Sequence, residues 1–198
     1  MSARSDNETE ASRRVKTEFM VQMQGVGASN DNGILVLGAT NLPWALDGAM
    51  RRRFEKRILI NLPEADARLE LLKNRMKNES HTLTDSDFAF LAQRTEFYSG
   101  SDLSALIKNA CYEPLRRFQN ATHFREATIG GKTGWVACAP TDPGAQAMLP
   151  TSLRGDQILK GEIDMDAFNK ALLNTKPTVG PSELVKFDEW TKQFGMEG

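Results

Sequence analysis

The chain has 198 residues and a formal net charge of −1 at pH 7, so strong bulk attraction to nucleic acid or to an acidic membrane surface is excluded. Its two cysteines, Cys111 and Cys138, show no CxxC spacing, which fits a reducing compartment and gives no pattern for a metal site. No apolar run approaches the roughly 20 residues that a membrane-spanning helix needs.

The first predicted element is a helix close to the N-terminus. Residues 2–11 are polar and show no periodicity, whereas Arg13–Gln24 has the spacing of an amphipathic helix. The apolar residues of this helix recur every four positions: Val15, Phe19 and Met23. Gly25 and Gly27 are expected to end it.

The central stretch begins with a short apolar run and ends with three arginines. Ile34–Leu37 is uninterrupted apolar sequence, which is typical of a strand buried on both faces of a parallel α/β sheet. Asn41 follows at the carboxyl end of this strand, where open α/β sheets bind their ligands. Pro43 and Asp47 indicate a turn and a helix start, and the next segment ends in Arg51–Arg53. An amide at a strand end followed by an arginine cluster suggests that this stretch handles a phosphate.

A second strand and two helices are predicted next. Arg57–Leu62 has the composition of a short strand, and Pro63 stops it. Glu64–Met76 and Thr84–Gln93 have helical spacing, and the start of the second is rich in Asp and Ser, which suits capping. We interpret them as the last strand of one subdomain and the opening of a helical lid.

The motif Tyr98-Ser-Gly-Ser-Asp-Leu103 opens the longest predicted helix. Gly100 is expected to permit a tight turn, and Ser101 or Asp102 to cap the helix. The N-terminus of a helix offers free N–H groups and the positive end of a dipole, which favour an anionic group. Taken alone, Gly-Ser-Asp is also a common structural cap. Pro114 lies inside this helix and is expected to kink it.

The C-terminal third is predicted to hold a small hairpin and two helices. Phe124–Ala127 and Trp135–Ala137 are expected to pair, with a turn near Gly130-Gly-Lys-Thr133. Asp164–Leu173 is predicted as a short capped helix, and Thr178–Ser182 opens the last helix. The apolar residues of this last helix lie on one face: Leu184, Phe187, Trp190 and Phe194.

In combination these motifs resemble the second half of an AAA ATPase module. The resemblance rests on four motifs in a fixed order: Gly38-Ala-Thr-Asn41, Pro43-Trp44, Leu46-Asp47 and Arg51-Arg-Arg-Phe-Glu55. It implies that Asn41 is the sensor-1 residue, which orients the attacking water and senses the γ-phosphate. It also implies that Arg52 and Arg53 are arginine fingers for the ATP of the neighbouring subunit, with Arg51 the weaker candidate. A lone Asn or a lone arginine run would be a turn former or solvated surface.

The same resemblance assigns roles outside the central stretch. Gly100 and Ser101 are implied to lie near the base and ribose of the nucleotide. Ser2–Arg14 is similar to the second pore loop of the family, and an ordinary frayed terminus is the alternative interpretation. The last helix is implied to pack back onto the large subdomain.

Residues around the predicted hairpin indicate which branch of the family this chain resembles. The run Ala121-Thr-His-Phe124 and the insertion that follows it are similar to the vacuolar protein-sorting branch, whereas katanin and spastin lack such an insertion. That branch usually carries an aromatic residue between the positions of Met148 and Leu153. This chain has none there, so the surface of its β domain is expected to differ.

The resemblance to the vacuolar protein-sorting branch implies what the intact protein does. It would use ATP and Mg²⁺ in a self-assembled ring, expected to be a hexamer, to remodel or disassemble ESCRT-III polymers. The implied partners are ESCRT-III subunits and an activator protein at the β domain, with no nucleic acid. The protein is expected in the cytoplasm, recruited to endosomal membranes only through partners.

A P-loop is missing from the printed sequence, which contains no G-x-x-x-x-G-K-[ST] run. Gly130-Gly-Lys-Thr133 comes nearest, but the first glycine of the motif is absent and no apolar strand precedes it. The chain is therefore expected to follow the Walker A and Walker B motifs and to hydrolyse no ATP by itself. The alternatives are a non-catalytic lid and β-domain interaction module, or a katanin- or spastin-like microtubule-severing ATPase.

The predicted fold class is α/β. It consists of the C-terminal part of the AAA large subdomain, with parallel strands and helices, then a helical lid with a small β-hairpin insertion and a C-terminal helix. The expected boundaries are 1–63 for the part of the large subdomain with pore loop 2, sensor 1 and arginine fingers, 64–122 for the lid, 123–160 for the β-domain insertion, and 161–198 for the end of the lid and the C-terminal helix.

Overall fold

The computed structural model describes residues 10–28, 35–129, 131–159 and 161–195. The chain divides into two compact units, the first formed by 1–61 with 181–198 and the second by 62–180. Within the described ranges, no helix is both long and apolar enough to cross a membrane. Most of the segment predicted as pore loop 2 lies outside the described residues.

The first unit opens with helix α1, Glu10–Ala28, where the sequence predicts a helix at Arg13–Gln24. The helix continues through Gly25 and Gly27, so the prediction that these glycines end it is wrong. A glycine inside a helix costs only about 1 kcal/mol relative to alanine, which weakens the helix without stopping it. Val15 on the predicted apolar face is 65% exposed, whereas Phe19 is 38% exposed and Met23 is half-buried, so the described residues cover that face only in part.

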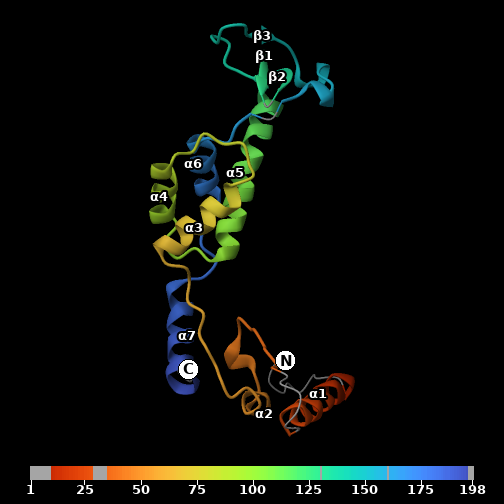
Figure 1. The fold of residues 1–198 in the computed structure, drawn as a ribbon, viewed down its shortest axis with the longest axis vertical. Helices are drawn as coiled ribbons and strands as arrows, with labels where there is room; N and C mark the ends of the chain where they lie inside the picture. The colour runs from red at the N-terminus through yellow and green to blue at the C-terminus, as the bar shows by residue number, and fades with distance from the viewer. Residues whose placement is uncertain (1–9, 29–34, 130, 160, 196–198) are drawn as a thin grey trace. The chain divides into compact units, whose positions relative to one another are not determined.

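The two parallel strands predicted in this unit do not form. Leu35–Leu37 and Ile58–Asn61 are extended chain without strand partners, and Figure 1 draws both as plain trace. Leu37 is 87% exposed and Ile60 is 89% exposed, so the prediction of strands buried on both faces is wrong. A strand needs a neighbour to satisfy its backbone N–H and C=O groups, and the described part of this unit contains no strand to supply one.

Three short or C-terminal elements complete the first unit. The 3₁₀ turn η1 spans Pro43–Ala45 and helix α2 spans Gly48–Arg51, as the predicted turn and helix start require. Helix α7, Pro181–Phe194, is the predicted last helix. It ends as expected at Gly195, whose N–H donates to the Thr191 carbonyl at 2.7 Å.

Four helices form the body of the second unit (Figure 1), and all four were predicted: α3, Ala65–Met76; α4, Asp85–Arg94; α5, Gly100–Asn120; and α6, Met165–Asn174. Their apolar faces share one core, whose fully buried members include Leu72, Met76, Leu91, Leu103, Leu106 and Phe168. Helix α5 continues through Pro114 as a single element. This unit therefore closes a hydrophobic core from its own residues.

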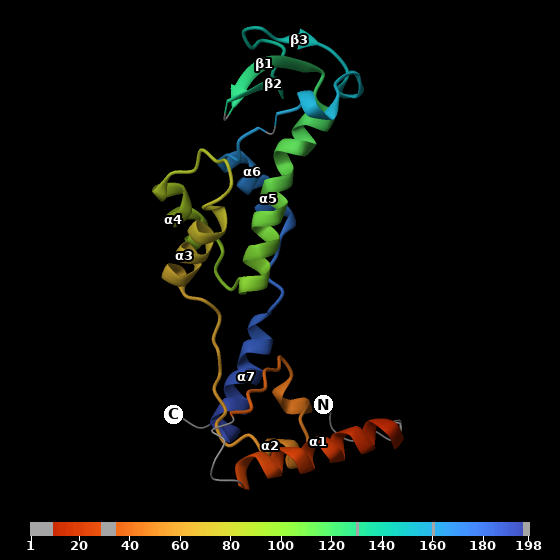
Figure 2. The same ribbon diagram turned by 45° about the vertical axis from the view of Figure 1, so that its right-hand side comes forward.

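A three-stranded antiparallel sheet lies beyond the C-terminal end of α5 (Figure 2). Its strands are β1, His123–Ile129; β2, Lys132–Ala137; and β3, Gln146–Ala147, in the order β2-β1-β3. Phe124 pairs with Ala137 and Ala127 with Gly134, which confirms the predicted hairpin. Gly131 has a φ of +80°, as the turn between the two strands requires. Two 3₁₀ turns follow the sheet: η2, Pro150–Ser152, and η3, Gly155–Gln157.

Candidate functional site

The segment that carries Asn41 is held against the residue that follows the arginine run. A Cβ atom added to Gly38 would lie 3.2 Å from Cζ of Phe54, so any larger residue would press on this ring and force it to shift. The Thr40 hydroxyl then accepts a hydrogen bond from the Leu42 N–H at 3.0 Å, which turns the chain. Asn41 lies in this turn and is exposed. Its side chain is therefore free to meet a ligand even though the preceding strand has not formed.

Hydrogen bonds fix the backbone of the arginine run. The Asp47 carboxylate accepts from the Met50 N–H at 2.7 Å and thereby caps α2. Met50 is 3% exposed and anchors this short helix. The N–H groups of Arg51 and Arg52 donate to the carbonyls of Asp47 and Gly48 at 3.0 and 3.3 Å. The three side chains therefore leave a backbone of defined geometry.

The three arginine side chains take different environments. The Arg51 guanidinium carbon lies 4.4 Å from the centre of the Phe194 ring. Arg53 folds back on its own helix and donates from Nη1 to the Ala49 carbonyl at 3.0 Å. Arg52 is exposed, and its side chain makes no hydrogen bond or ion pair to the residues that the structure describes. Among the three, Arg52 is the one presented to an incoming group.

Helix α7 packs on this same region, as the sequence resemblance implies. The rings of Trp44 and Phe187 lie 5.0 Å apart between their centroids. Trp190 and Phe194 form a second pair, at 5.5 Å, at the end of the helix. The Trp44–Phe187 contact joins α7 to η1, and the contact of Arg51 with Phe194 joins it to the arginine run.

The predicted nucleotide turn at the start of α5 is built differently from the expectation. Ser99 is the cap, not Ser101 or Asp102: its hydroxyl accepts from the Asp102 N–H at 3.2 Å, and the Asp102 carboxylate accepts from the Ser99 N–H at 2.9 Å. Gly100 needs no positive φ, because the left-handed residue of this turn is Phe97, at 64°. A cap three residues before an acidic residue is the capping-box spacing, so Ser99 could have been found from the sequence.

Gly100 and Ser101 occupy the first turn of α5. Ser101 is exposed and Gly100 is half-buried. A Cβ added to Gly100 would meet Leu71 only at 3.8 Å, an ordinary contact, so packing within the unit does not require glycine there. Both residues belong to the second unit, whereas Asn41 and the arginines belong to the first.

The start of α5 is also tied to the chain that follows α6. The Asp102 carboxylate accepts from the Thr178 N–H at 3.3 Å, and the Tyr98 hydroxyl donates to the Thr175 carbonyl. Burial disfavours the ionised form of Asp102, but the hydrogen bonds from Ser99 and Thr178 outweigh burial and lower its pKa below the ordinary aspartate value. Sequence reasoning identified Asp102 only as a cap, because its contact with Thr178 spans 76 positions.

An ion-pair network holds the other end of α5. Arg117 donates from both terminal nitrogens to the Asp164 carboxylate at 2.8 Å and reaches Asp166 at 2.9 Å. The hydrogen bonds to Asp164 raise the pKa of Arg117, and the same contacts lower the pKa of Asp164. Asp164 also caps α6 through the Ala167 N–H at 2.9 Å.

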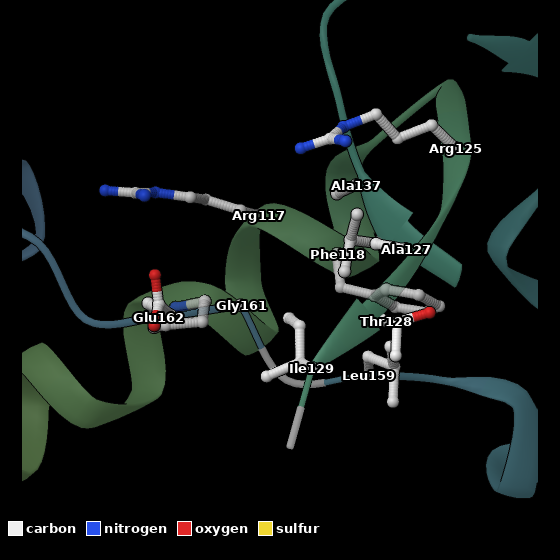
Figure 3. Close-up of a pocket in the computed structure, with 12 residues that line it drawn as sticks. Arg117, Phe118, Arg125, Ala127, Thr128, Ile129, Ala137, Leu159, Gly161 and Glu162 are labelled. Atoms are coloured by element: carbon white, nitrogen blue, oxygen red, sulfur yellow. The ribbon is translucent and has the colours of Figure 1, made fainter. Parts of the chain in front are cut away.

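A cavity of about 490 Å³ lies beside this network. It is lined by residues from α5, by residues from the β1–β2 hairpin, and by Leu159, Gly161 and Glu162 (Figure 3). Phe118, Ile129 and Leu159 supply apolar surface, and Arg125 and Glu162 supply charge. No group of His, Cys, Asp and Glu side chains in the described ranges could hold a metal ion.

Three family profiles match successive parts of the chain. They are the AAA profile, described as the ATPase family associated with various cellular activities, at residues 1–62, the AAA+ lid domain at 85–128, and the Vps4 C terminal oligomerisation domain at 135–195. These matches confirm the predicted fold class of an AAA large-subdomain part followed by a lid with a small sheet.

Individual relatives match nearly the whole chain. Vacuolar protein sorting-associated protein 4B of Pongo abelii is 46% identical over 204 residues, which cover 99% of this chain and 46% of that protein. Spastin of Anopheles gambiae is 37% identical over 196 residues, covering 98% of this chain and 20% of spastin. The crystal structure of the FIGL-1 AAA domain superimposes with a TM-score of 0.72 at 32% identity, over 94% of this chain and 53% of that one.

The chain thus spans less than half the length of these curated relatives. Within that span, the AAA, lid and Vps4 profiles follow one another in chain order. The chain therefore belongs to the AAA ATPase family, and among its members it is similar to vacuolar protein sorting-associated protein 4.

Proposed function

We propose that this chain is the catalysis-completing part of an ATP-driven AAA ring ATPase that remodels or disassembles ESCRT-III polymers in vacuolar and endosomal protein sorting. Asn41 acts as sensor 1, and Arg52 and Arg53 serve as arginine fingers for the neighbouring subunit's ATP. The observation that carries the proposal is the exposed Arg52 directly after the capped helix α2, in a chain 46% identical to vacuolar protein sorting-associated protein 4B.

The residues present fit one part of a Mg²⁺–ATP site. Gly100 and Ser101 start a long helix, whose dipole and free N–H groups suit a nucleotide near the turn. A guanidinium such as that of Arg52 can place two fixed donors on phosphate oxygens as charge builds in the transition state. The sequence has no P-loop to cradle the phosphates. The chain alone is accordingly proposed to bind no ATP tightly and to hydrolyse none.

The same proposal covers assembly and location. Residues 1–63 belong to the large subdomain, 64–122 and 161–198 to the lid and its C-terminal helix, and 123–160 to the β domain. The intact protein forms a ring, a hexamer, in the cytoplasm and reaches endosomal membranes through its partners. Its substrates are ESCRT-III subunits, and an activator protein binds the β domain. The Vps4 C terminal oligomerisation match at 135–195 supports this assignment.

The decisive experiment uses a chimera in which this chain replaces the matching 204 residues of the Pongo abelii relative. Arg52→Ala should lower the kcat of the chimera at least a hundredfold, because arginine fingers supplied in trans contribute about 10³–10⁵. The KM for ATP should change little, since Arg52 does not reach its own subunit's nucleotide. Lys56→Ala, which removes another exposed cation of the same segment, is the matched control and should leave kcat within about twofold.

Mixing the Arg52→Ala chimera with a P-loop mutant should restore part of the activity. Wherever an intact arginine faces an intact nucleotide pocket, one competent site exists. Rings shown to be mixed but without recovered activity would contradict the in-trans assignment.

A second candidate function is a non-catalytic interaction module. The self-contained core of the second unit and the cavity beside its sheet favour it. Equilibrium binding of a labelled ATP analogue to the chimera separates the two, because a module that only binds partners would leave the nucleotide affinity unchanged when Gly100 and Ser101 are replaced. The katanin- or spastin-like alternative has less support, since spastin is 37% identical where the sorting protein is 46% identical.

A further inference from the structure

We propose that Arg51 is a positioning residue and not a finger: Phe194, the last residue of α7, holds its guanidinium and thereby sets the direction of the neighbouring Arg52. The inference rests on the proposed function of the arginine run. It gives the C-terminal helix a specific task at the site. The contact that carries it is the 4.4 Å approach of the Arg51 guanidinium to the centre of the Phe194 ring.

The contact is favourable for two physical reasons. A guanidinium over an aromatic ring is attracted by the ring's negative face. Phe194 also ends α7, where the helix dipole is negative and favours a cation. Arg51 is half-buried in this position, so its side chain is partly withdrawn from the solvent that an approaching phosphate would occupy.

Hydrogen bonds to the backbone around Arg52 hold the segment next to Arg51. The Arg57 guanidinium donates from Nη1 to the Arg51 carbonyl at 3.3 Å, so both the side chain and the backbone of Arg51 are held. The Arg52 N–H is bonded to the Gly48 carbonyl at 3.3 Å, and the Arg53 N–H to the Met50 carbonyl at 3.0 Å. With Arg51 held on one side and the Arg52 N–H bonded to α2, the direction in which the Arg52 side chain leaves the backbone is set.

The rest of α7 supports the placement of the ring. Trp190 lies 5.5 Å from Phe194 between ring centroids, and Phe187 packs on Trp44 at 5.0 Å. Trp190 of the same helix therefore supports the Phe194 ring, and the Phe187–Trp44 contact holds the helix independently of that ring. Loss of the ring alone should release Arg51 while α7 keeps its other contact.

The first test measures the contact in the 198-residue chain. The ring of Phe194 should shift the Arg51 side-chain protons upfield in NMR spectra. Phe194→Leu keeps apolar bulk but should return these protons to ordinary values, whereas Phe194→Tyr should keep the shift. Val185→Ala, on an exposed position of the same helix, is the matched control and should change nothing. Unshifted Arg51 protons in the unaltered chain would overturn the proposal.

The second test measures the consequence in the chimera described above. Phe194→Leu and Arg51→Met should each lower kcat between about twofold and thirtyfold, the range expected for loss of one cation–π contact. The KM for ATP should stay unchanged, and Phe194→Tyr should retain activity. The double variant should be no worse than either single one, because both remove the same contact.

The outcomes separate the alternatives. If Arg51→Met alone costs 10³ or more in kcat, Arg51 is itself a finger and the proposal is wrong. If Phe187→Leu lowers kcat as much as Phe194→Leu, docking of α7 as a whole is what matters, and the specific role of the Phe194–Arg51 pair is refuted. An inactive chimera would count against the proposed function, while the NMR test still decides whether Phe194 holds Arg51.

Discussion

The two units of this chain differ in how completely they bury their apolar residues. In the second unit four helices close around one core, and Leu72 and Phe168 are fully buried. In the first unit large aliphatic side chains stand in solvent, among them Leu37 at 87% and Ile60 at 89% exposure. The comparison teaches that the lid carries its own stability, whereas the large-subdomain part holds its residues by caps, aromatic pairs and hydrogen bonds.

The largest expected effect is on the free energy of unfolding, when the same leucine-to-alanine substitution is made in each unit. Leu72→Ala should lower the free energy of unfolding of the second unit by about 2–5 kcal/mol, because it opens a cavity in a closed core. Leu37→Ala should change stability by less than about 0.5 kcal/mol, since its side chain has almost no packing to lose. Urea unfolding followed by far-ultraviolet circular dichroism measures both. Equal losses would mean that Leu37 is buried in solution and would end the comparison.

The next effect concerns a close backbone approach in the second unit. A Cβ atom at Gly134 would lie 2.6 Å from the Gln157 carbonyl oxygen, so Gly134→Ala must push β2 away from that segment. We expect a loss of about 1–3 kcal/mol, read from the unfolding curve and from the fluorescence of Trp135. Gly155→Ala is the control, because a Cβ there meets nothing within 4 Å. A neutral Gly134→Ala would show that the β2 and 157–159 segments are not packed together.

A smaller effect depends on pH and tests what holds the start of α5. The pKa of Asp102 is lowered in the folded state, so its stabilising contribution is present above the ordinary aspartate pKa of about 4 and is lost as the pH falls through the lower folded value. Asp102→Asn should reduce stability by about 1 kcal/mol at pH 7. The difference between the two proteins should shrink as the pH falls from about 5 to below 3. A difference that stays constant over this range would exclude the ionised carboxylate as its source.

The smallest expected effect is a weak self-association of the chain through its first unit. The exposed segments at 35–37 and 58–61 offer a second copy their apolar side chains and a backbone that pairs with no strand among the described residues. Sedimentation velocity at increasing concentration should detect association, and Leu37→Lys with Ile60→Lys should reduce it. Leu173→Lys in the second unit, at a residue 79% exposed on a helix, is the control and should have little influence. A monodisperse monomer at high concentration would contradict this prediction.

Much of the second unit could be predicted from the sequence, because its signals are local. Helical spacing predicts α3 to α6, and Asp164 marks the start of α6 because a short acidic side chain caps a backbone N–H three residues later. Two short β-prone runs around a Gly-Gly turn predict that Phe124–Ala127 pairs with Trp135–Ala137, and the structure adds the register, Phe124 opposite Ala137. The cap of α5 is Ser99, two or three positions before the predicted Ser101 or Asp102 and within the same motif.

The first unit shows where local signals were insufficient. An apolar run predicts a buried strand only if other strands and helices cover it, and Leu35–Leu37 has no such cover among the described residues. The positions of Asn41 and of the arginines along the chain were nevertheless identified, because the motif lies in consecutive residues. Their roles stay predictions that the chimera experiments test.

Local patterns in the sequence were enough to predict where the helices and the hairpin lie and to select Asn41, Arg52 and Arg53 as candidate residues, since each pattern extends over a few positions. The placement of Arg51 against Phe194, in contrast, depends on long-range packing, whereas Arg53 bonds a carbonyl only four residues before it. Identical side chains at neighbouring positions have the same local propensities. What distinguishes Arg51 is the aromatic ring that α7 brings back from far along the chain, and no local pattern encodes that contact.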